Sequence, residues 1–408
     1  MTDSQNRSDV ASSATERALN NSDALVAQLR ETRLEPGRHV QLEALALAVC
    51  ANLPVLLWGE PGIGKSAILS QLAEQYGLPL ETVIASVHEP SDFAGLPIVG
   101  ENPEQGVPMA PPDWAVRLAA RGTGLLFFDE LSTAPPAVQA ALLRVVLERR
   151  VGSLNLPDRV RIVAAANPPA SAADGWHLSP PLANRFVHLQ WAHDPPTVAR
   201  GLAGTWPYVA IPVVDPSRSV SAIARARGSV SAFLTARPGL AHSMPREGEA
   251  RGRAWPSPRT WEMALRLLAV SFACPNASIE ARSELMVGTL GDGAGLEFVS
   301  FLESLDLPDP DHVLARPEEF TLPQRGDRQL AFLTAVVSAV QSRLSESRWR
   351  AAWVVLGKAV EAGIPDVAAR AALDLAQLRD AKWLPPAQAL AFGEVLRLSG
   401  VNLGSARR

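Results

Sequence analysis

The stretch that most constrains this chain is a glycine-rich loop between an apolar run, PVLLW (54–58), and a helix-like segment, AILSQLAEQYG (67–77). The loop consists of Gly59, Glu60, Pro61, Gly62, Ile63, Gly64, Lys65 and Ser66. It has the spacing G-x-x-x-x-G-K-[ST] in the strand–loop–helix context that this motif requires. Glycines let backbone N–H groups converge on phosphate oxygens, and the helix N-terminus adds partial positive charge. We therefore expect a nucleoside triphosphate here, with Lys65 on its β- and γ-phosphates and Ser66 on Mg²⁺.

The composition is that of a globular protein and excludes several classes. No apolar run approaches the length of about 20 residues that a membrane-spanning helix needs, and the polar start lacks the pattern of a secretory signal, so we expect a cytoplasmic protein without a membrane partner. Two cysteines are too few for a disulfide framework. The net charge of −4 favours no polyanion, and we do not expect nucleic acid as the partner. Lysine is rare, since only three of the 38 basic residues are lysine, which makes Lys65 unlike generic surface charge.

The hydrophobic pattern divides the chain into three parts. Residues 1–37 are polar and predict a flexible tail. Residues 38–192 alternate apolar runs with helix-like segments, which predicts an α/β domain with a parallel five-stranded sheet; the runs are 54–58, 82–87, 124–129, 161–166 and 186–190. Residues 193–408 have helical spacing, for example at 260–273 and 328–344, and predict an all-α lid followed by a C-terminal helical bundle.

Two further strand ends carry polar side chains suited to phosphate chemistry. Asp129 and Glu130 end the run GLLFFD, about 60 residues after the loop. Asp129 would hold Mg²⁺ together with Ser66, and Glu130 would orient and deprotonate a water molecule, which favours hydrolysis over phosphoryl transfer to a small acceptor. Taken alone, an acidic pair is more often a helix cap. Asn167 follows the next run, where its amide could bind the γ-phosphate or the water, although Asn-Pro is also a common turn.

With these elements in order, the chain resembles the AAA+ ATPases, and within them the MoxR-like and dynein-related group. The motifs that carry the resemblance are GEPGIGKS, LLFFDE, ERRVGSLNLPDRVRIVAAANPP, PLANRF and SPRTW. It implies ATP and Mg²⁺ as cofactors, with Asn167 as the sensor 1 residue, Arg185 as the arginine finger and Arg259 as the sensor 2 arginine. It also implies a homo-oligomer, in the form of a hexameric ring, in which the finger crosses to the neighbouring subunit's ATP.

Some implications of the resemblance stay open. Arg185 could instead be a cation at a helix C-terminus, and Arg259 a surface residue at a helix N-terminus; whether sensor 2 acts within one subunit or across the interface is undecided. The segment 95–119 looks like the hairpin that relatives insert near helix 2 to touch clients, although 96–112 could be a plain loop. Ser86 is a weak candidate for the residue that senses a bound client. Residues Gly37 to Gln41 are where relatives contact the base.

By resemblance, the leading functional hypothesis is a MoxR-type ATPase that remodels or assembles client protein complexes, with a partner bearing a von Willebrand factor A domain. That client role rests on analogy of fold. One alternative is a nucleotide-gated scaffold or switch with little turnover. Another is a nucleic-acid-directed motor or a GTP-specific relative.

Overall fold

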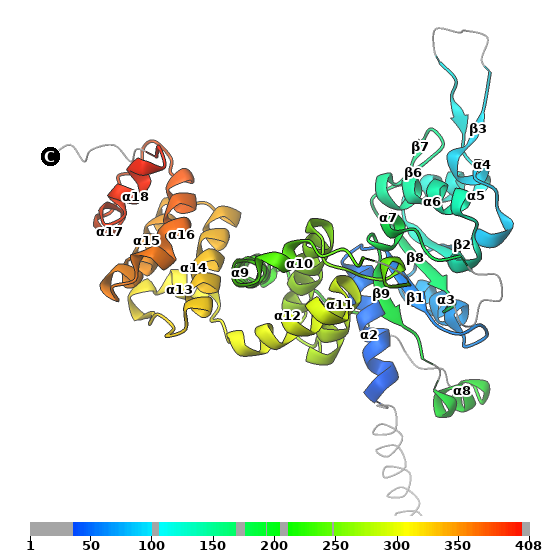
Figure 1. Ribbon diagram of the computed structural model, residues 1–408, viewed down its shortest axis with the longest axis horizontal. Helices are drawn as coiled ribbons and strands as arrows, with labels where there is room; N and C mark the ends of the chain where they lie inside the picture. The colour runs from blue at the N-terminus through cyan, green and yellow to red at the C-terminus, as the bar shows by residue number, and fades with distance from the viewer. Residues whose placement is uncertain are drawn as a thin grey trace, which may run out of the picture.

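The computed structural model describes residues 36–99, 106–168, 176–192, 194–204, 211–246 and 249–401. Most of the expected N-terminal tail lies outside the described residues. The described chain is elongated, with the sheet at one end, helices α9 to α12 (within 219–305) in the middle and helices α13 to α18 (within 310–398) at the other end (Figure 1). No helix in the described ranges is both long and apolar enough to cross a membrane.

The central sheet is parallel and five-stranded, with the order β2-β5-β8-β1-β9. Its strands are β1 (Val55–Trp58), β2 (Leu80–Ile84), β5 (Gly124–Asp129), β8 (Val160–Ala166) and β9 (Val187–Gln190). The α/β prediction is therefore confirmed, but the second strand was expected at 82–87. It ends earlier because β2 is an edge strand whose only partner is β5, and Ile84 pairs with Asp129, the last residue of β5. Residues Ala85–Val87 then form a 3-10 turn.

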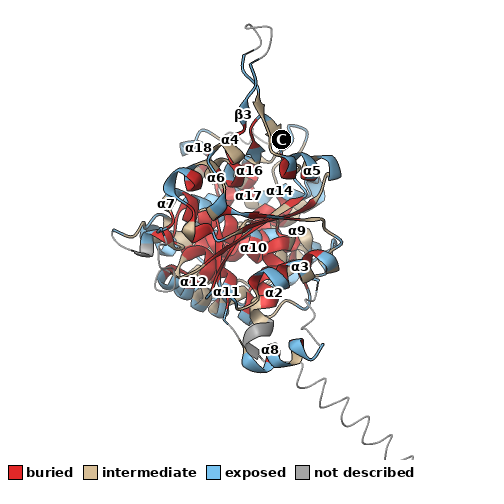
Figure 2. Cartoon of the chain, turned by 90° about the vertical axis from the view of Figure 1, so that its right-hand side faces the viewer, coloured by how far each residue is buried: buried red, intermediate tan, exposed pale blue. Residues whose placement is uncertain are grey.

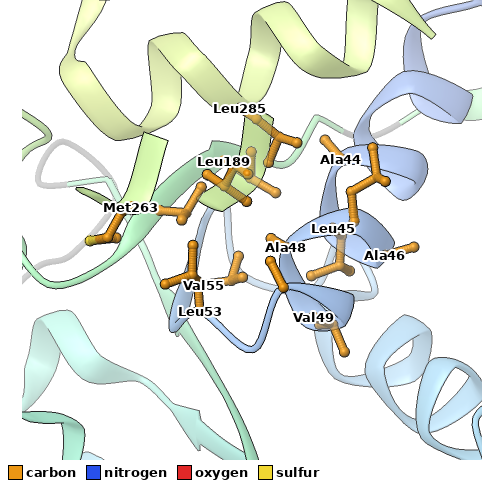
Figure 3. Close-up of a cluster of buried hydrophobic side chains, with 14 of the residues drawn as sticks. Ala44, Leu45, Ala46, Ala48, Val49, Leu53, Val55, Leu189, Met263 and Leu285 are labelled. Carbon is orange, nitrogen blue, oxygen red and sulfur yellow. The ribbon is translucent and has the colours of Figure 1, made fainter. Parts of the chain in front are cut away.

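Helices cover both faces of the sheet because its middle strands are apolar on both sides. The helices on one face are α2 (Pro36–Cys50), α3 (Lys65–Gln75), α10 (Pro258–Ala273) and α11 (Ile279–Leu290). Figure 3 shows this core, in which Leu45 of α2, Leu189 of β9 and Leu285 of α11 lie together. The helices on the other face are α4 (Ser91–Ala94), α5 (Asp113–Arg121), α6 (Pro136–Glu148) and α7 (Pro180–Ala183). The buried residues lie along the sheet and on the sides of these helices that face it, and the exposed residues lie on the outer sides of the helices (Figure 2).

Every element of the described chain after β9 is helical. The remaining helices are α8 (Pro195–Leu202), α9 (Ser219–Ala236), α12 (Asp292–Leu305), α13 (Pro310–Ala315), α14 (Gly326–Ser342), α15 (Glu346–Glu361), α16 (Pro365–Gln377), α17 (Ala387–Leu390) and α18 (Gly393–Leu398). A separate core, centred on Phe332, Trp349 and Trp353, holds the C-terminal helices together. Helix α10 contributes to the same core as the sheet, so it packs directly against the α/β part.

Two short antiparallel hairpins leave the sheet. The first joins β3 (Leu96–Pro97) to β4 (Met109–Ala110), so the expected inserted hairpin is confirmed over its described residues, and the plain-loop alternative is wrong. It projects away from the body of the molecule (Figure 1). The tip at 100–105 lies outside the described residues. The second hairpin joins β6 (Arg150–Val151) to β7 (Leu154–Asn155) and leads into β8.

Candidate functional site

The glycine-rich loop joins the end of β1 to the start of α3. Gly62 and Gly64 have φ angles of 79° and 87°, in the left-handed region that glycine adopts without strain. Gly64 is the N-cap of α3 and no side chain caps the first turn, so the first N–H groups of the helix are left for another acceptor. The loop therefore has the backbone geometry of an anion cradle at a helix N-terminus.

Lys65, the first residue of α3, is buried at 8% exposure and points back into the loop. Its Nζ donates to the carbonyl oxygens of Gly59 and Glu60, at 2.7 and 2.9 Å, and to Oδ1 of Asn167 at 3.1 Å. Burial lowers the pKa of the Lys65 ammonium, and the carboxylate of Asp129 opposes that shift. These contacts hold a partly desolvated cation beside the loop, which suits it to bind phosphate.

Ser66 and Asp129 lie together at the carboxyl edge of the sheet. Ser66 Oγ donates to Asp129 Oδ2 at 3.0 Å, and the N–H of Glu130 donates to Asp129 Oδ1 at 2.9 Å. Hydroxyl and carboxylate oxygens are the ligands that Mg²⁺ prefers beside a nucleotide. The donor set fits the expected cation, which Ser66 Oγ and Asp129 would hold next to the phosphates.

Glu130 lies immediately after β5 in a left-handed conformation, with φ of 56°. Its Oε2 accepts a hydrogen bond from Ser86 Oγ at 2.5 Å, and its backbone carbonyl accepts one from Thr133. Left-handed backbone is uncommon for a non-glycine residue and costs energy. The hydrogen bond from Ser86 directs the Glu130 carboxylate towards the turn that follows β2.

Asn167 directly follows β8, next to the loop that follows β1, because Trp58 and Ala166 are paired in neighbouring strands. Its side chain accepts from Lys65, and its N–H donates to the Oγ of the buried Ser132 at 3.0 Å. Sequence reasoning missed Ser132. Its only signal was its position two residues after Glu130.

Arg185 and Arg259 are not part of this cluster. Arg185 precedes β9, whose first residue, Val187, pairs with Val55 at the start of β1. At about 3.3 Å per residue, β9 carries the chain about 10 Å from Val187 to Gln190, which pairs with Trp58 beside the loop. Arg185 therefore lies at the amino edge of the sheet, opposite the loop.

The two arginines lie near each other at that edge. Arg185 Nη1 donates to the carbonyl of Pro181, and its Nε is buried without a partner among the described residues. Burial, and then the positive charge of Arg259, lower the pKa of the Arg185 guanidinium. Arg259 is the second residue of α10 and is exposed. Two cations side by side repel each other, so an anion between them would stabilise both.

The expected base-contacting segment opens α2, and only the side chains of Val40 and Gln41 in that stretch are described. Gln41 Oε1 is buried and has no hydrogen-bond partner among the described residues. It can accept a hydrogen bond from an amino group, which keeps Gln41 as the residue to test for base recognition.

Comparison with known proteins agrees with this geometry. Residues 54–186 match the family of AAA domains of the dynein-related subfamily. The protein MoxR of Methylorubrum extorquens is 32% identical over 120 residues, which cover 29% of this chain and 34% of that protein. Midasin of Giardia intestinalis is 29% identical over 153 residues, which cover 36% of this chain and 3% of midasin. The chain thus spans about a third of MoxR and a small part of midasin.

A crystal structure of a candidate ATPase from Cytophaga hutchinsonii has a TM-score of 0.39 and 17% identity, and covers 76% of this chain and 98% of that one. This overall likeness is low, and no correspondence of residues follows from it. The resemblance to AAA+ ATPases of the MoxR-like, dynein-related group is confirmed, and the matched region carries the loop, both acidic residues, Asn167 and Arg185.

Proposed function

We propose that this protein is an oligomeric ATPase that hydrolyses ATP with Mg²⁺ at the interfaces between its protomers. One observation carries the proposal. Lys65, Ser66, Asp129 and Asn167 are joined by hydrogen bonds at the carboxyl edge of the sheet. Arg185 lies at the amino edge, where the start of α10, which carries Arg259, is bonded to the turn before Arg185. The arginines cannot serve their own protomer's phosphates, but they can serve those of a neighbour.

The contacts support the following roles within one site. Lys65 and the N–H groups at the start of α3 bind the phosphates, and Ser66 with Asp129 holds Mg²⁺, which supplies charge to the phosphate oxygens. Glu130 is the carboxylate placed to accept a proton from the attacking water. The backbone N–H of Asn167 donates to Ser132 Oγ, which fixes the start of the turn after β8, and the side-chain Oδ1, which accepts from Lys65 in this structure, would orient that water when ATP is bound.

Arg185 and Arg259 complete the site from the adjacent protomer. The Nε of Arg185 is buried and has no partner among the residues that the structure describes, and burial lowers the pKa of its guanidinium; an anion brought to it would supply the missing partner. The γ-phosphate of a neighbouring ATP supplies it, which favours sensor 2 acting across the interface together with the finger. A closed ring, six-membered as in the family, gives every protomer both a loop and an arginine pair.

The projecting hairpin is the proposed client-contacting element. Its described residues leave large apolar side chains exposed, with Leu96 at 62%, Val99 at 87% and Val107 at 56%. Exposed apolar surface of this kind marks interaction sites. Remodelling or assembly of client complexes, with a partner bearing a von Willebrand factor A domain, is the function that the family resemblance adds to this surface.

A second candidate is a switch with low basal turnover, and the Ser86–Glu130 hydrogen bond is the observation that favours it. The bond occupies one oxygen of the proposed base. Ser86 lies between β2 and the segment that leads to the hairpin, so movement of the hairpin could release Glu130. Turnover measured with and without client distinguishes the two.

The dependence of activity on protein concentration tests the shared site. Specific ATPase activity is measured over a range of protein concentrations. Analytical sedimentation measures the mass of the oligomer at each concentration. We expect activity per protomer to rise as the oligomer forms. Constant activity from a demonstrated monomer would leave only a self-contained P-loop ATPase.

A further inference from the structure

The turn that carries Arg185 is joined to the helix that carries Arg259 through the side chain of Asn184. Asn184 is buried at 2% exposure, and it lies between the end of α7 and Arg185. Its Nδ2 donates to the carbonyl of Trp255 at 3.0 Å, and its Oδ1 accepts from Ser257 Oγ at 2.7 Å. Ser257 is the N-cap of α10.

The cap on the α10 side is itself fully bonded. Ser257 Oγ accepts from the N–H of Thr260 at 3.2 Å, the N–H of Ser257 donates to Thr260 Oγ1 at 2.7 Å, and Thr260 Oγ1 donates to the carbonyl of Trp255 at 3.0 Å. All of these hydrogen bonds are buried. A satisfied buried network of this kind fixes one arrangement of its members.

We propose that Asn184 is a positioning residue that locks the Arg185 turn to the N-terminus of α10, so that Arg185 and Arg259 enter the neighbouring protomer's nucleotide site as one unit. The inference rests on the proposed function and names the residue that sets its geometry. Among the described residues, the guanidinium of Arg185 donates one hydrogen bond, to the carbonyl of Pro181 four residues earlier. Its position relative to Arg259 therefore depends on the turn, and the turn is tied to α10 by Asn184.

The chemistry of the two partners requires an amide at this position. Ser257 Oγ presents a proton and the carbonyl of Trp255 presents a lone pair, so one side chain must accept and donate at once. Aspartate would place an oxygen against the carbonyl of Trp255, and leucine would remove both hydrogen bonds that join the Arg185 turn to the start of α10. Neither substitution touches Lys65, Ser66 or Asp129.

The test uses the full-length oligomer and measures ATP affinity and turnover separately. Asn184→Leu should bind ATP as the wild type does, because the loop is intact. Its turnover should fall by about 10- to 100-fold, since misplacing a catalytic group by about 1 Å costs about 10²-fold. The matched control is Gln329→Leu, which removes a hydrogen bond of another buried side-chain amide, from Gln329 Nε2 in α14 to the carbonyl of Pro323 at 2.7 Å. Gln329→Leu should hydrolyse ATP at the wild-type rate.

Mixing Asn184→Leu with a second variant distinguishes a positioning role of Asn184 from a general loss of structure. Asn184→Leu mixed with Lys65→Ala should regain activity. At some interfaces the intact loop of an Asn184→Leu protomer meets the correctly placed arginine pair of a Lys65→Ala protomer. Mixed with Arg185→Ala, Asn184→Leu should show no more activity than the separate variants, because neither protomer supplies a correctly placed arginine pair. Loss of ATP affinity in Asn184→Leu, wild-type turnover, or no recovery with Lys65→Ala would each overturn the inference.

Two further variants keep the result interpretable. If Asn184→Leu does not fold, Ser257→Ala removes the same bond from the other side, and wild-type turnover there would overturn the inference. Arg185→Ala tests the proposed function itself. Full activity in that variant would contradict the shared site, whereas an inactive Arg185→Ala beside a fully active Asn184→Leu would contradict only the role of Asn184.

Discussion

Lys65 Nζ lies 3.1 Å from Asn167 Oδ1, which joins the residue that follows the glycine-rich loop to the residue that follows β8. The ammonium also donates to two carbonyl oxygens of the loop itself, so its three protons all have partners. Because the cation is already desolvated and aimed at the loop, binding ATP exchanges these contacts for phosphate oxygens without a large rearrangement. The site is therefore organised around Lys65.

Replacing Lys65 with alanine should cost most of the affinity for ATP. Hydrogen bonds to charged groups contribute about 1.5–3 kcal/mol, which corresponds to about 10- to 150-fold in Kd. Isothermal titration measures the change. Lys382→Ala removes an exposed lysine far along the chain and should leave the affinity unchanged. Wild-type affinity in Lys65→Ala would remove the loop from nucleotide binding.

Glu130→Gln should keep ATP binding and stop turnover. The amide preserves the shape of the side chain, but it cannot accept the proton of the attacking water. Single-turnover hydrolysis and nucleotide titration on the same sample separate the two effects. Hydrolysis near the wild-type rate would show that another group is the base.

Ser86→Ala should raise client-independent turnover, because it frees the Glu130 oxygen that Ser86 now holds at 2.5 Å. A net hydrogen-bond contribution of about 0.5–1.5 kcal/mol corresponds to about a two- to tenfold change in rate. Steady-state phosphate release measures it, and Glu130→Gln in the same background should abolish the gain. Reduced turnover would instead mean that Ser86 helps to orient the base.

His188 should make stability fall in acid. It is fully buried on β9, accepts from Trp58 Nε1 and bonds the carbonyl of Ala183, each at 2.9 Å. Burial lowers the pKa of His188 to about 4, opposed by the bond to Ala183 and assisted by Arg253. The unfolded chain binds the proton more readily, so the contribution is complete above about pH 6.5 and is lost as the pH falls towards 4.

The shift limits that loss to about 3 kcal/mol in the free energy of unfolding. Denaturant unfolding at several pH values measures it. His188→Gln can accept from Trp58 and donate to Ala183 without titrating, so it is the matched variant and should flatten the curve between pH 6.5 and 4. An equally steep curve in His188→Gln would assign the acid sensitivity to other groups.

The parts of the fold that were predictable from the sequence are those with strong local signals. The strands β1, β5 and β8 are continuous apolar runs, and the ends of parallel strands meet at one edge, which brings Asp129 and Asn167 to the loop. The limits of β2 were wrong because an edge strand stops where its single partner stops. The roles of the site residues remain predictions.

Contacts between residues distant in the chain had no such signal. Asn184 and Ser257 are 73 positions apart, and their hydrogen bond depends on how α10 packs on the sheet. The edge on which Arg185 lies follows from the register of β9 with β1, which no local pattern specifies. Ser132 was missed for the same reason, since only the packing of β8 beside β5 brings it to Asn167.

The most direct test of the shared site is to mix two inactive variants. Arg185→Ala should bind ATP but lose about 10³- to 10⁵-fold in turnover, as arginine fingers do, and Lys65→Ala should be inactive for lack of bound ATP. Combined at oligomer-forming concentration, they should recover part of the wild-type activity, because at some interfaces an intact loop meets an intact Arg185. Mixtures that show no more activity than the separate variants, although mixed oligomers form, would contradict a site shared between protomers.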